Sequence, residues 1–429
     1  MLILFYGAHM KLIFAFVISL LLLINFVSCD TSEPLPKGAV GLSLDDVSCT
    51  EAWITLTAGN LSNTAYIRIT GNGKLLETLD VNSVKTALYI DTLQPNTSYE
   101  FQAFSSQRGE EIVGNKLQFT TLDTTSHNFT WQTFEFGQHS SSTLYDVAII
   151  NENDIWAVGE IYMNDSLGNP DPVPYNTIHW NGTDWELKKI KYLVNGSYII
   201  PVIHSVFSFG KNDIWFDSFI RWDGTSFKDI PFTISFSHNI NKLWGVNSSD
   251  LYAVGDEGNI AHFDGIKWTK VQTLTDYNFN DISGYKDQYG SEIILTVANK
   301  NYISKIFSVN NFTIIDTLDW NNNTWINSCW INKYKLYVCG RGIWKYVNNS
   351  WSAEEGLPDY NYKFIRGSGA NNLFVIDSQS HISHFNGLSW EMYDQSTDYF
   401  FESISTGEKV VAVTGNYQGR ALIKIGRRN

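Results

Sequence analysis

The stretch NDIWAVG, residues Asn153–Gly159, decides the fold of most of this chain because it recurs along the sequence. Close copies are NDIW at Asn212–Trp215 and SDLYAVG at Ser249–Gly255. Weaker copies, which complete a set of seven, begin at Ser291, Lys335, Asn371 and Glu408. Self-similarity of this kind indicates a repeat architecture, in which each repeat buries its apolar face against its neighbours.

A second motif, HWNGTDW at His179–Trp185, alternates with the first. It returns at Arg221–Phe227, His262–Trp268 and His384–Trp390, with Asn-Gly or Asp-Gly at its centre. These dipeptides favour tight hairpin turns because both residues tolerate positive φ. Each repeat therefore predicts two hairpins, hence four strands, which is the content of one β-propeller blade.

The two ends of the repeat region predict how a ring would close. The seventh repeat ends at Ala421–Ile425 without an outer strand, whereas Asn128–Phe136, upstream of the first repeat, matches the outer-strand segment of the others. We expect residues 128–429 to form a seven-bladed propeller in which this N-terminal strand completes the last blade and removes an exposed edge. Six or eight blades are the alternatives. The repeats resemble those of a loose class of secreted bacterial propellers with DIWAVG and DGxxW motifs, distantly similar to kelch and WD40 proteins, and such a fold does not fix a function.

Residues 38–122 predict a separate all-β domain. Short strand-like runs separated by turn signals recur through this stretch, as in a β-sandwich of about seven strands. The segment LQPNTSYEFQA, Leu93–Ala103, resembles the L-x-P-x-T-x-Y segment of fibronectin type III domains. That resemblance implies a sandwich with a tyrosine corner at Tyr99, which spaces or presents the propeller.

Residues 1–29 predict an export signal. Lys11 precedes an apolar run that ends at Ser28, as in a secretory signal peptide, and Met10 is an alternative start. Phe26-Val27-Ser28-Cys29 resembles a bacterial lipobox. That resemblance implies cleavage before Cys29, lipid on its thiol and a membrane anchor in the bacterial cell envelope. An ordinary cleaved signal or an uncleaved anchor helix is the alternative. Residues 30–37 read as a polar linker.

Composition and motifs narrow the classes of partner. The net charge of −14 repels phosphate backbones, so nucleic acid is excluded as a partner. The sequence contains no zinc-protease, phosphate-loop or nucleophile-elbow motif, and we expect neither a cofactor nor a metal. The Trp and His residues that recur at fixed positions of the repeats are expected to pack between blades. A monomeric, non-enzymatic protein is the favoured interpretation.

The repeat is interrupted most strongly in its first copy. An insertion, Glu160–Tyr175, separates the second and third strands, and a long connection, Lys191–Ile199, leads to the next repeat. In a propeller these two kinds of loop open on the same face, and long loops on a rigid scaffold often carry binding. This lip therefore predicts a ligand site, with a passive insertion as the alternative; its candidate residues are Tyr162, Asp171, Tyr175, Tyr192 and Tyr198.

Polar residues of the first strands are candidates for the mouth of the central channel. They include Asp146, His204 and Asp281. Asp146 and Asp281 come from distant repeats, so a carboxylate pair for glycoside chemistry is conceivable.

Cys329 and Cys339 flank the first hairpin of the fifth repeat, within one residue of opposite register. Two alternatives are open outside the cytoplasm, a cross-strand disulfide or two buried free thiols.

Three hypotheses for function follow. The first is a membrane-anchored binding protein whose propeller loop face takes a polysaccharide, a peptide or a protein. The second is a carbohydrate-active hydrolase or lyase with its site at the channel. The third is a scaffold within an envelope complex.

Overall fold

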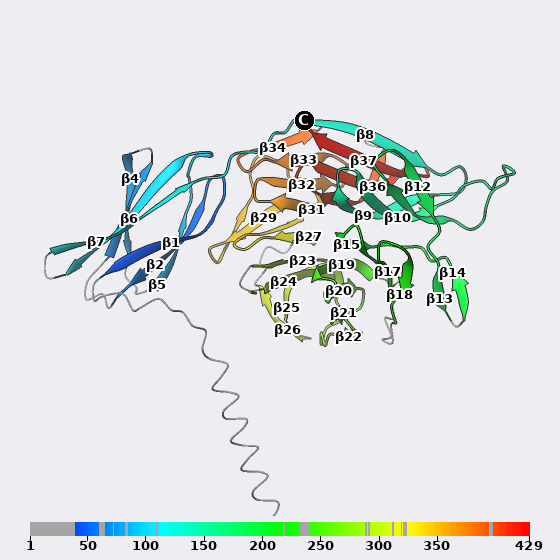
Figure 1. Ribbon diagram of the computed structural model, residues 1–429, viewed down its shortest axis with the longest axis horizontal. Coiled ribbons are helices and arrows are strands. Elements are labelled where there is room, and N and C mark those ends of the chain that lie inside the picture. The colour runs from blue at the N-terminus through cyan, green and yellow to red at the C-terminus, as the bar shows by residue number, and fades with distance from the viewer. Residues whose placement is uncertain are drawn as a thin grey trace, which may run out of the picture. The chain divides into compact units, whose positions relative to one another are not determined.

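The computed structural model describes residues 39–429 except 60–64, 72, 82–84, 108–109, 195, 218, 232–239, 288–289, 291, 311–312, 319, 321–323 and 394–397. The predicted signal, Cys29 and the linker lie outside the described residues. Every regular element within them is a β-strand (Figure 1), and they contain no helix of the length and apolar composition needed to cross a membrane. The chain divides into two compact units. The first contains residues 53–90, 98–120 and the described residues up to Asp46, and the second contains 47–52, 91–97 and 121–429.

The first unit contains two sheets with the strand orders β1-β2-β5 and β4-β3-β6-β7. Apolar side chains of β2, β3 and β6 form its core, with Leu56, Ile67 and Phe101 at most 1% exposed. Tyr99 is also buried, and its ring stacks on Phe119 with 6.0 Å between centroids. The strands are β1 (Val40–Val47), β2 (Ala52–Ala58), β3 (Ala65–Gly71), β4 (Lys74–Val81), β5 (Lys85–Ile90), β6 (Ser98–Gln107) and β7 (Glu110–Thr120).

The described residues of the second unit form seven four-stranded antiparallel sheets and one two-stranded hairpin. Six of these sheets use four consecutive strands. The seventh has the order β35-β36-β37-β8, so a strand from the start of the unit is its outer strand. Strand β8 pairs with β37 from Phe129, opposite Arg428, to Phe136, opposite Ala421. This is the segment that the sequence analysis assigned to the last repeat.

The strands of the first three four-stranded sheets and the hairpin are β9 (Thr143–Asn151), β10 (Asp154–Ile161), β11 (Tyr175–Trp180), β12 (Trp185–Lys188), the hairpin β13 (Tyr192–Val194) and β14 (Ser197–Ile199), β15 (Val206–Gly210), β16 (Asp213–Phe216), β17 (Ile220–Trp222), β18 (Phe227–Asp229), β19 (Ile240–Asn247), β20 (Asp250–Gly255), β21 (Ile260–Phe263) and β22 (Trp268–Lys270).

The strands of the other four sheets are β23 (Asn278–Lys286), β24 (Glu292–Lys300), β25 (Ile303–Asn310), β26 (Thr313–Leu318), β27 (Ile326–Ile331), β28 (Leu336–Gly340), β29 (Gly342–Val347), β30 (Ser350–Ala353), β31 (Tyr362–Gly369), β32 (Asn372–Asp377), β33 (Ile382–Phe385), β34 (Trp390–Tyr393), β35 (Tyr399–Thr406), β36 (Val410–Tyr417), β37 (Arg420–Arg428) and β8 (Phe129–Phe136).

The core of the second unit lies between neighbouring sheets. Trp156 of β10, for example, belongs to one buried cluster with Ile214 of the next sheet. Similar clusters join each sheet to the following one, and the cluster around Leu144 of the first sheet includes Ile423 of the last. The sheets therefore follow one another in a ring. The first strand of each sheet contacts the first strand of the next, and β35 contacts β9, so these strands line the centre.

The repeated motif explains how each sheet holds its side chains. Asp154 Oδ1 accepts hydrogen bonds from Trp156 Nε1 at 3.1 Å and from His179 Nε2 at 2.9 Å, and the Trp and His rings stack 4.2 Å apart. In the next sheet Asp213 accepts from Trp215 and Arg221 in the same way. His179, Arg221 and His262, which share this repeat position, therefore each complete a carboxylate contact within their own sheet.

Candidate functional site

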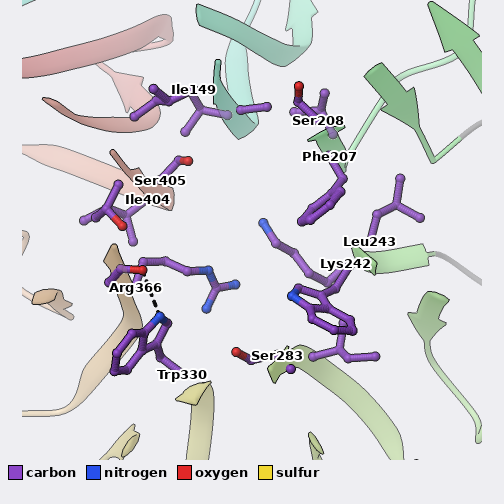
Figure 2. Close-up of a pocket in the computed structure, with 18 residues that line it drawn as sticks. Ile149, Phe207, Ser208, Lys242, Leu243, Ser283, Trp330, Arg366, Ile404 and Ser405 are labelled. Carbon is purple, nitrogen blue, oxygen red and sulfur yellow. Dashed lines mark hydrogen bonds between the residues drawn. The ribbon is translucent and has the colours of Figure 1, made fainter. Parts of the chain in front are cut away.

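A pocket with a volume of about 350 Å³ lies at the centre of the second unit. The first strands of all seven sheets contribute to it (Figure 2). Six of them contribute residues from the central or carboxyl-terminal part of the strand, whereas the contribution of β15 begins at its first residue, Val206. The lining residues are Val147–Ile149, Val206–Ser208, Lys242–Trp244, Ile282–Gly284, Trp330, Arg366–Gly367 and Ile404–Thr406.

Three aromatic residues form much of the pocket wall: Phe207, Trp244 and Trp330. Two of them, Trp244 and Trp330, pack closely against glycines of the following sheet. A Cβ added to Gly284 would come within 2.3 Å of the Trp244 ring, and one added to Gly367 would come within 2.9 Å of the Trp330 ring. Trp330 Nε1 also donates to Gly367 O at 2.8 Å. The wall is therefore held in place by close packing between sheets.

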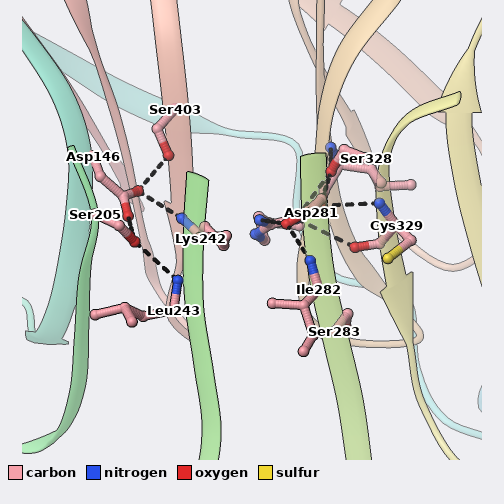
Figure 3. Close-up of polar contacts among 12 residues, drawn as sticks. Asp146, Ser205, Lys242, Leu243, Asp281, Ile282, Ser283, Ser328, Cys329 and Ser403 are labelled. Carbon is pink, nitrogen blue, oxygen red and sulfur yellow. Dashed lines mark hydrogen bonds and ion pairs between the residues drawn. The ribbon is translucent and has the colours of Figure 1, made fainter. Parts of the chain in front are cut away.

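Asp146 of β9 accepts one group of polar contacts at the central pocket (Figure 3). We call Lys242, Arg366 and the two carboxylates that pair with them, Asp146 and Asp281, the pocket floor. The Asp146 carboxylate accepts hydrogen bonds from Ser205 Oγ at 3.1 Å, Val206 N at 3.0 Å and Ser403 Oγ at 2.6 Å. Lys242 Nζ lies 2.6 Å from Asp146 Oδ1 and forms an ion pair with it. One buried carboxylate thus joins strands of four sheets.

Asp281 of β23 has the corresponding role on the other side (Figure 3). Arg366 forms a bidentate ion pair with it, with Nη1 to Oδ2 at 2.8 Å and Nη2 to Oδ1 at 2.7 Å. Ser328 Oγ and Cys329 N donate to the same carboxylate. Burial, the largest single effect, would raise the pKa of Asp281, but the Arg366 guanidinium together with Lys242 and Ser328 holds this pKa below its usual value.

These contacts decide what the two predicted channel acids can do chemically. Asp146 and Asp281 are each 2% exposed, and each is part of an ion pair. A general acid must hold a proton near neutral pH, whereas the lowered pKa keeps Asp281 ionised. The arrangement supports a structural role for both carboxylates rather than acid–base catalysis.

His204, the third predicted channel residue, lies just before β15 and apart from the pocket lining. Its backbone N–H donates to Asp217 Oδ2 at 2.8 Å, and its Nδ1 lies 3.7 Å from the same oxygen. The Asp217 carboxylate raises the pKa of His204. Its ring packs 4.7 Å from that of Tyr145, whose hydroxyl donates to Glu160 Oε1 at 3.1 Å. This polar cluster marks the amino ends of the first strands.

The predicted lip residues near the insertion contact the scaffold. Tyr162 OH donates to Glu160 Oε2 at 3.3 Å, and Tyr162 N donates to Ser142 Oγ at 3.0 Å. Asp171 forms an ion pair with Lys189 at 2.7 Å, and the Lys189 ammonium lies 4.8 Å from the centre of the Tyr175 ring. The insertion thus packs at the amino end of β9, whereas the pocket is lined by later residues of that strand.

Tyr192 and Tyr198, the two other lip residues, lie on the hairpin β13–β14. Tyr192 packs against the buried cluster between the first and second sheets. Tyr198 is 65% exposed and pairs across the hairpin with Leu193, which is 43% exposed. The structure therefore brings Asp171 and Tyr175 together at Lys189 and leaves the other three lip residues in other contacts, and the role of all five in binding stays a prediction.

Cys329 and Cys339 are both free and buried, which corresponds to the second of the two alternatives. The register places Ser328 opposite Cys339 and Cys329 opposite Val338, one residue away from a direct pairing. Successive residues of a strand point to opposite faces. Cys329 accordingly packs against the fourth sheet, and Cys339 packs against the sixth.

The sequence analysis did not single out the aromatic wall or Arg366. Trp244 of β19, Trp330 of β27 and Arg366 of β31 hold equivalent positions in their sheets. Each of these strands has a register shift near its start, and the named residue lies two positions after the first residue that follows the shift. A signal was present in the spacing, because side chains two residues apart on a strand share a face, as Lys242 and Trp244 do. Trp in a first strand, however, looks like a core residue.

Comparisons with known proteins bear on the fold. No protein-family model matches the chain, and no curated protein matches its sequence. Among solved structures, YCF48 bound to D1 peptide is 13% identical and has a TM-score of 0.53, covering 72% of this chain and 100% of that chain. YCF48 from Cyanidioschyzon merolae is 12% identical, with a TM-score of 0.48 and coverage of 70% of this chain and 98% of that chain. BamB from Moraxella catarrhalis is 8% identical, with a TM-score of 0.39 and coverage of 70% and 100%. These neighbours are β-propeller proteins, and the first likeness shows that this chain contains a β-propeller.

Proposed function

We propose that this chain is a non-enzymatic binding protein of the bacterial cell envelope, whose propeller takes a peptide segment of a partner protein in its central pocket. In this proposal the seven sheets are seven blades, and the first unit is a fibronectin type III-like spacer. Lipid on Cys29 anchors the chain to the membrane. The observation that carries the proposal is the pocket itself, about 350 Å³ in volume with an aromatic wall.

The pocket has the size and composition of a binding site. Ligand sites are commonly concave, of roughly 300 to 1,000 Å³, with apolar walls and a few well-placed polar groups. Phe207, Trp244 and Trp330 offer large, rigid contact areas, which dominate the energetics of many interfaces. YCF48, with which this chain shares the propeller fold, was solved bound to a peptide, so a propeller of this kind is compatible with such a ligand.

The alternative of a carbohydrate-active enzyme finds less support. Glycoside hydrolysis commonly needs two carboxyl groups, one protonated as the acid and one free to act as a base or nucleophile. Asp146 and Asp281 are both ion-paired and buried. The same pocket would suit a polysaccharide as a ligand, and that alternative is an outcome of the test below.

The test is binding of the labelled full chain, in detergent, to peptide and glycan arrays. We expect peptides to bind, and Trp244→Ala to weaken that binding about tenfold or more through loss of wall area. Trp325→Ala is the matched control, because Trp325 is 45% exposed and lies outside the pocket lining. Binding to glycans alone would replace the peptide ligand with a polysaccharide. Binding to neither array would contradict the proposal.

The membrane anchor has its own test. Bacteria that produce the chain are grown with radiolabelled palmitate, and incorporation is compared with that of a Cys29→Ser variant. We expect label in the original chain and none in the variant. An unlabelled chain, or equal labelling of both, would rule out lipid on Cys29.

A further inference from the structure

The floor of the central pocket presents cations and hides their carboxylates. The side chains of Lys242 and Arg366 are 14% and 18% exposed, whereas those of their partners Asp146 and Asp281 are 2% and 3% exposed. Figure 2 shows the two cationic side chains extending into the pocket from opposite sides. The four formal charges cancel, but a ligand in the pocket meets the N–H groups first.

Both cations keep hydrogen-bonding capacity. Among the described residues, the hydrogen-bond partner of Lys242 Nζ is Asp146, which takes one of three N–H bonds. Arg366 Nη1 is engaged with Asp281 and with oxygen atoms of its neighbours, but the described contacts of Nη2 end with Asp281. Nη2 carries two hydrogens, so one is left for a ligand.

The chemistry of the floor selects an anionic acceptor with a single charge. Hydrogen bonds from a cation to a carboxylate are roughly twice as strong as those between neutral groups. A doubly charged group such as a phosphate would meet cations already balanced by two carboxylates, in a chain with a net charge of −14. One carboxylate is therefore better matched to this floor than a dianion.

The walls select what the carboxylate is attached to. Phe207, Trp244 and Trp330 surround the same space, together with aliphatic residues such as Ile149 and Ile404. An apolar side chain next to the carboxylate would bury its surface against these rings, which is favourable in proportion to the area removed from water.

We propose, building on the binding function above, that the pocket recognises a carboxylate carried beside an apolar side chain of a peptide. Lys242 and Arg366 donate hydrogen bonds to the carboxylate, and Trp244 and Trp330 pack on the side chain. The carboxylate comes from the C-terminus of a peptide or from an acidic side chain next to an apolar residue, and the chemistry of recognition is the same in both cases.

Three small probes test this proposal with the full chain in detergent. N-acetyl-phenylalanine carries a terminal carboxylate, N-acetyl-aspartyl-phenylalaninamide carries a side-chain carboxylate, and N-acetyl-phenylalaninamide carries none. Dissociation constants are measured by ligand-observed NMR at pH 7. We expect at least one acidic probe to bind about tenfold or more tightly than the neutral amide. The acidic probe that binds more tightly identifies the source of the carboxylate.

Variants locate the effect. Lys242→Gln should remove most of the preference for carboxylate while keeping the weak binding of the amide, because the walls remain. Lys267→Gln, in an exposed turn, is the matched control and should behave like the original chain. Because Lys242→Gln leaves Asp146 without its ion pair, the double variant Asp146→Asn/Lys242→Gln is made as well, and thermal unfolding checks that each variant is folded.

The outcomes separate this inference from the function on which it rests. Equal binding of acidic and neutral probes would overturn the carboxylate inference and leave peptide binding intact. Failure of all three probes, with array peptides still bound, would also overturn this inference alone. Failure of both probes and array peptides would overturn the proposed function too.

Discussion

The two ends of the first strands both carry polar and aromatic side chains, but they use them differently. At the amino ends these groups contact the scaffold. The Asn241 amide donates to Phe279 O of the next sheet at 3.0 Å, and Lys363 Nζ donates to Phe401 O at 3.3 Å. In the carboxyl halves, Trp244 and Arg366 line an open pocket. A polar residue near the end of the central channel is therefore a strong candidate for ligand binding only where contacts with the rest of the protein leave part of its hydrogen-bonding capacity unused.

Loss of the Asp281 carboxylate should have the largest effect on stability, because this carboxylate is buried and pairs with Arg366. Asp281→Asn leaves the Arg366 guanidinium in a buried place without its charge partner. Removing one member of a buried ion pair typically costs about 3–5 kcal/mol. We expect a loss of that size in the free energy of unfolding, measured by urea denaturation.

Asp229→Asn, at an exposed strand end, is the control and should change stability by less than about 0.5 kcal/mol. If Asp281→Asn cost less than about 1 kcal/mol, the carboxylate would not hold the ring centre together and the comparison would fail.

The sheets were predictable from the sequence because each repeats a local signal. The Asp-Gly and Asn-Gly turns fix short hairpins, and Asp154 or Asp213 bonds to residues of its own sheet. The ion pairs of the pocket floor were harder to predict from the sequence. Asp281 and Arg366 belong to different sheets, and only the geometry of the ring brings them together. The sequence left two alternatives open for the cysteines for a related reason, since a register shift of one residue decides that Cys329 and Cys339 lie on opposite faces.

Acid should affect the outer edge of the ring before its centre. In the sixth sheet, His384 Nε2 contacts Asn372 Oδ1 at 3.0 Å, and its Nδ1 lies 2.8 Å from Nδ1 of His127, which precedes β8. Because the Asn oxygen is an acceptor, His384 donates from Nε2 and accepts from His127 at Nδ1. Burial lowers the pKa of His384 to about 3, aided by the neighbouring His127. Protonation would place a second hydrogen between the two rings.

The sign of the pH effect follows from this lowered pKa. Between about pH 6.5 and pH 3 the unfolded chain binds a proton at His384 that the folded chain does not, so stability falls as pH falls. At pH 4 the loss from this residue is roughly 3 kcal/mol. Urea denaturation at pH 7, 5.5 and 4 measures it, and His384→Gln should flatten the dependence. An unchanged slope in that variant would show that the acid sensitivity lies elsewhere.

A shortened lip tests whether the ligand binds at the amino ends of the first strands, where the lip lies, or in the central pocket. Asp165–Asn169 forms the tip of the insertion, closed by the bridge between Asn164 and Pro170 and by the Asp165 N to Asn169 O bond at 2.7 Å. Replacing the tip by Gly-Gly keeps the Asp171–Lys189 ion pair. We expect stability to change by less than about 1 kcal/mol, since the cost of closing a surface loop varies slowly with its length. Peptide binding on the array should stay within about twofold, well under 1 kcal/mol. A tenfold loss of peptide affinity would show that the ligand binds at the lip and not in the pocket, which is the opposite of the assignment made above.

The smallest expected effect is a pH dependence that distinguishes the two ends without any deletion. His204, at the amino ends, has a raised pKa because of Asp217, so it stabilises the fold below its unfolded value of about 6.5 and this contribution is lost as pH rises through the folded pKa. The Asp281–Arg366 pair of the pocket floor keeps its charges through the same range, since the pKa of Asp281 is lowered and that of Arg366 is raised by their pairing against the opposing effect of burial. Binding of N-acetyl-phenylalanine should therefore change less than about twofold between pH 6 and pH 8, an energy difference well under 1 kcal/mol. A larger change that disappears in His204→Gln would place the carboxylate beside His204, because that substitution removes the group whose charge changes.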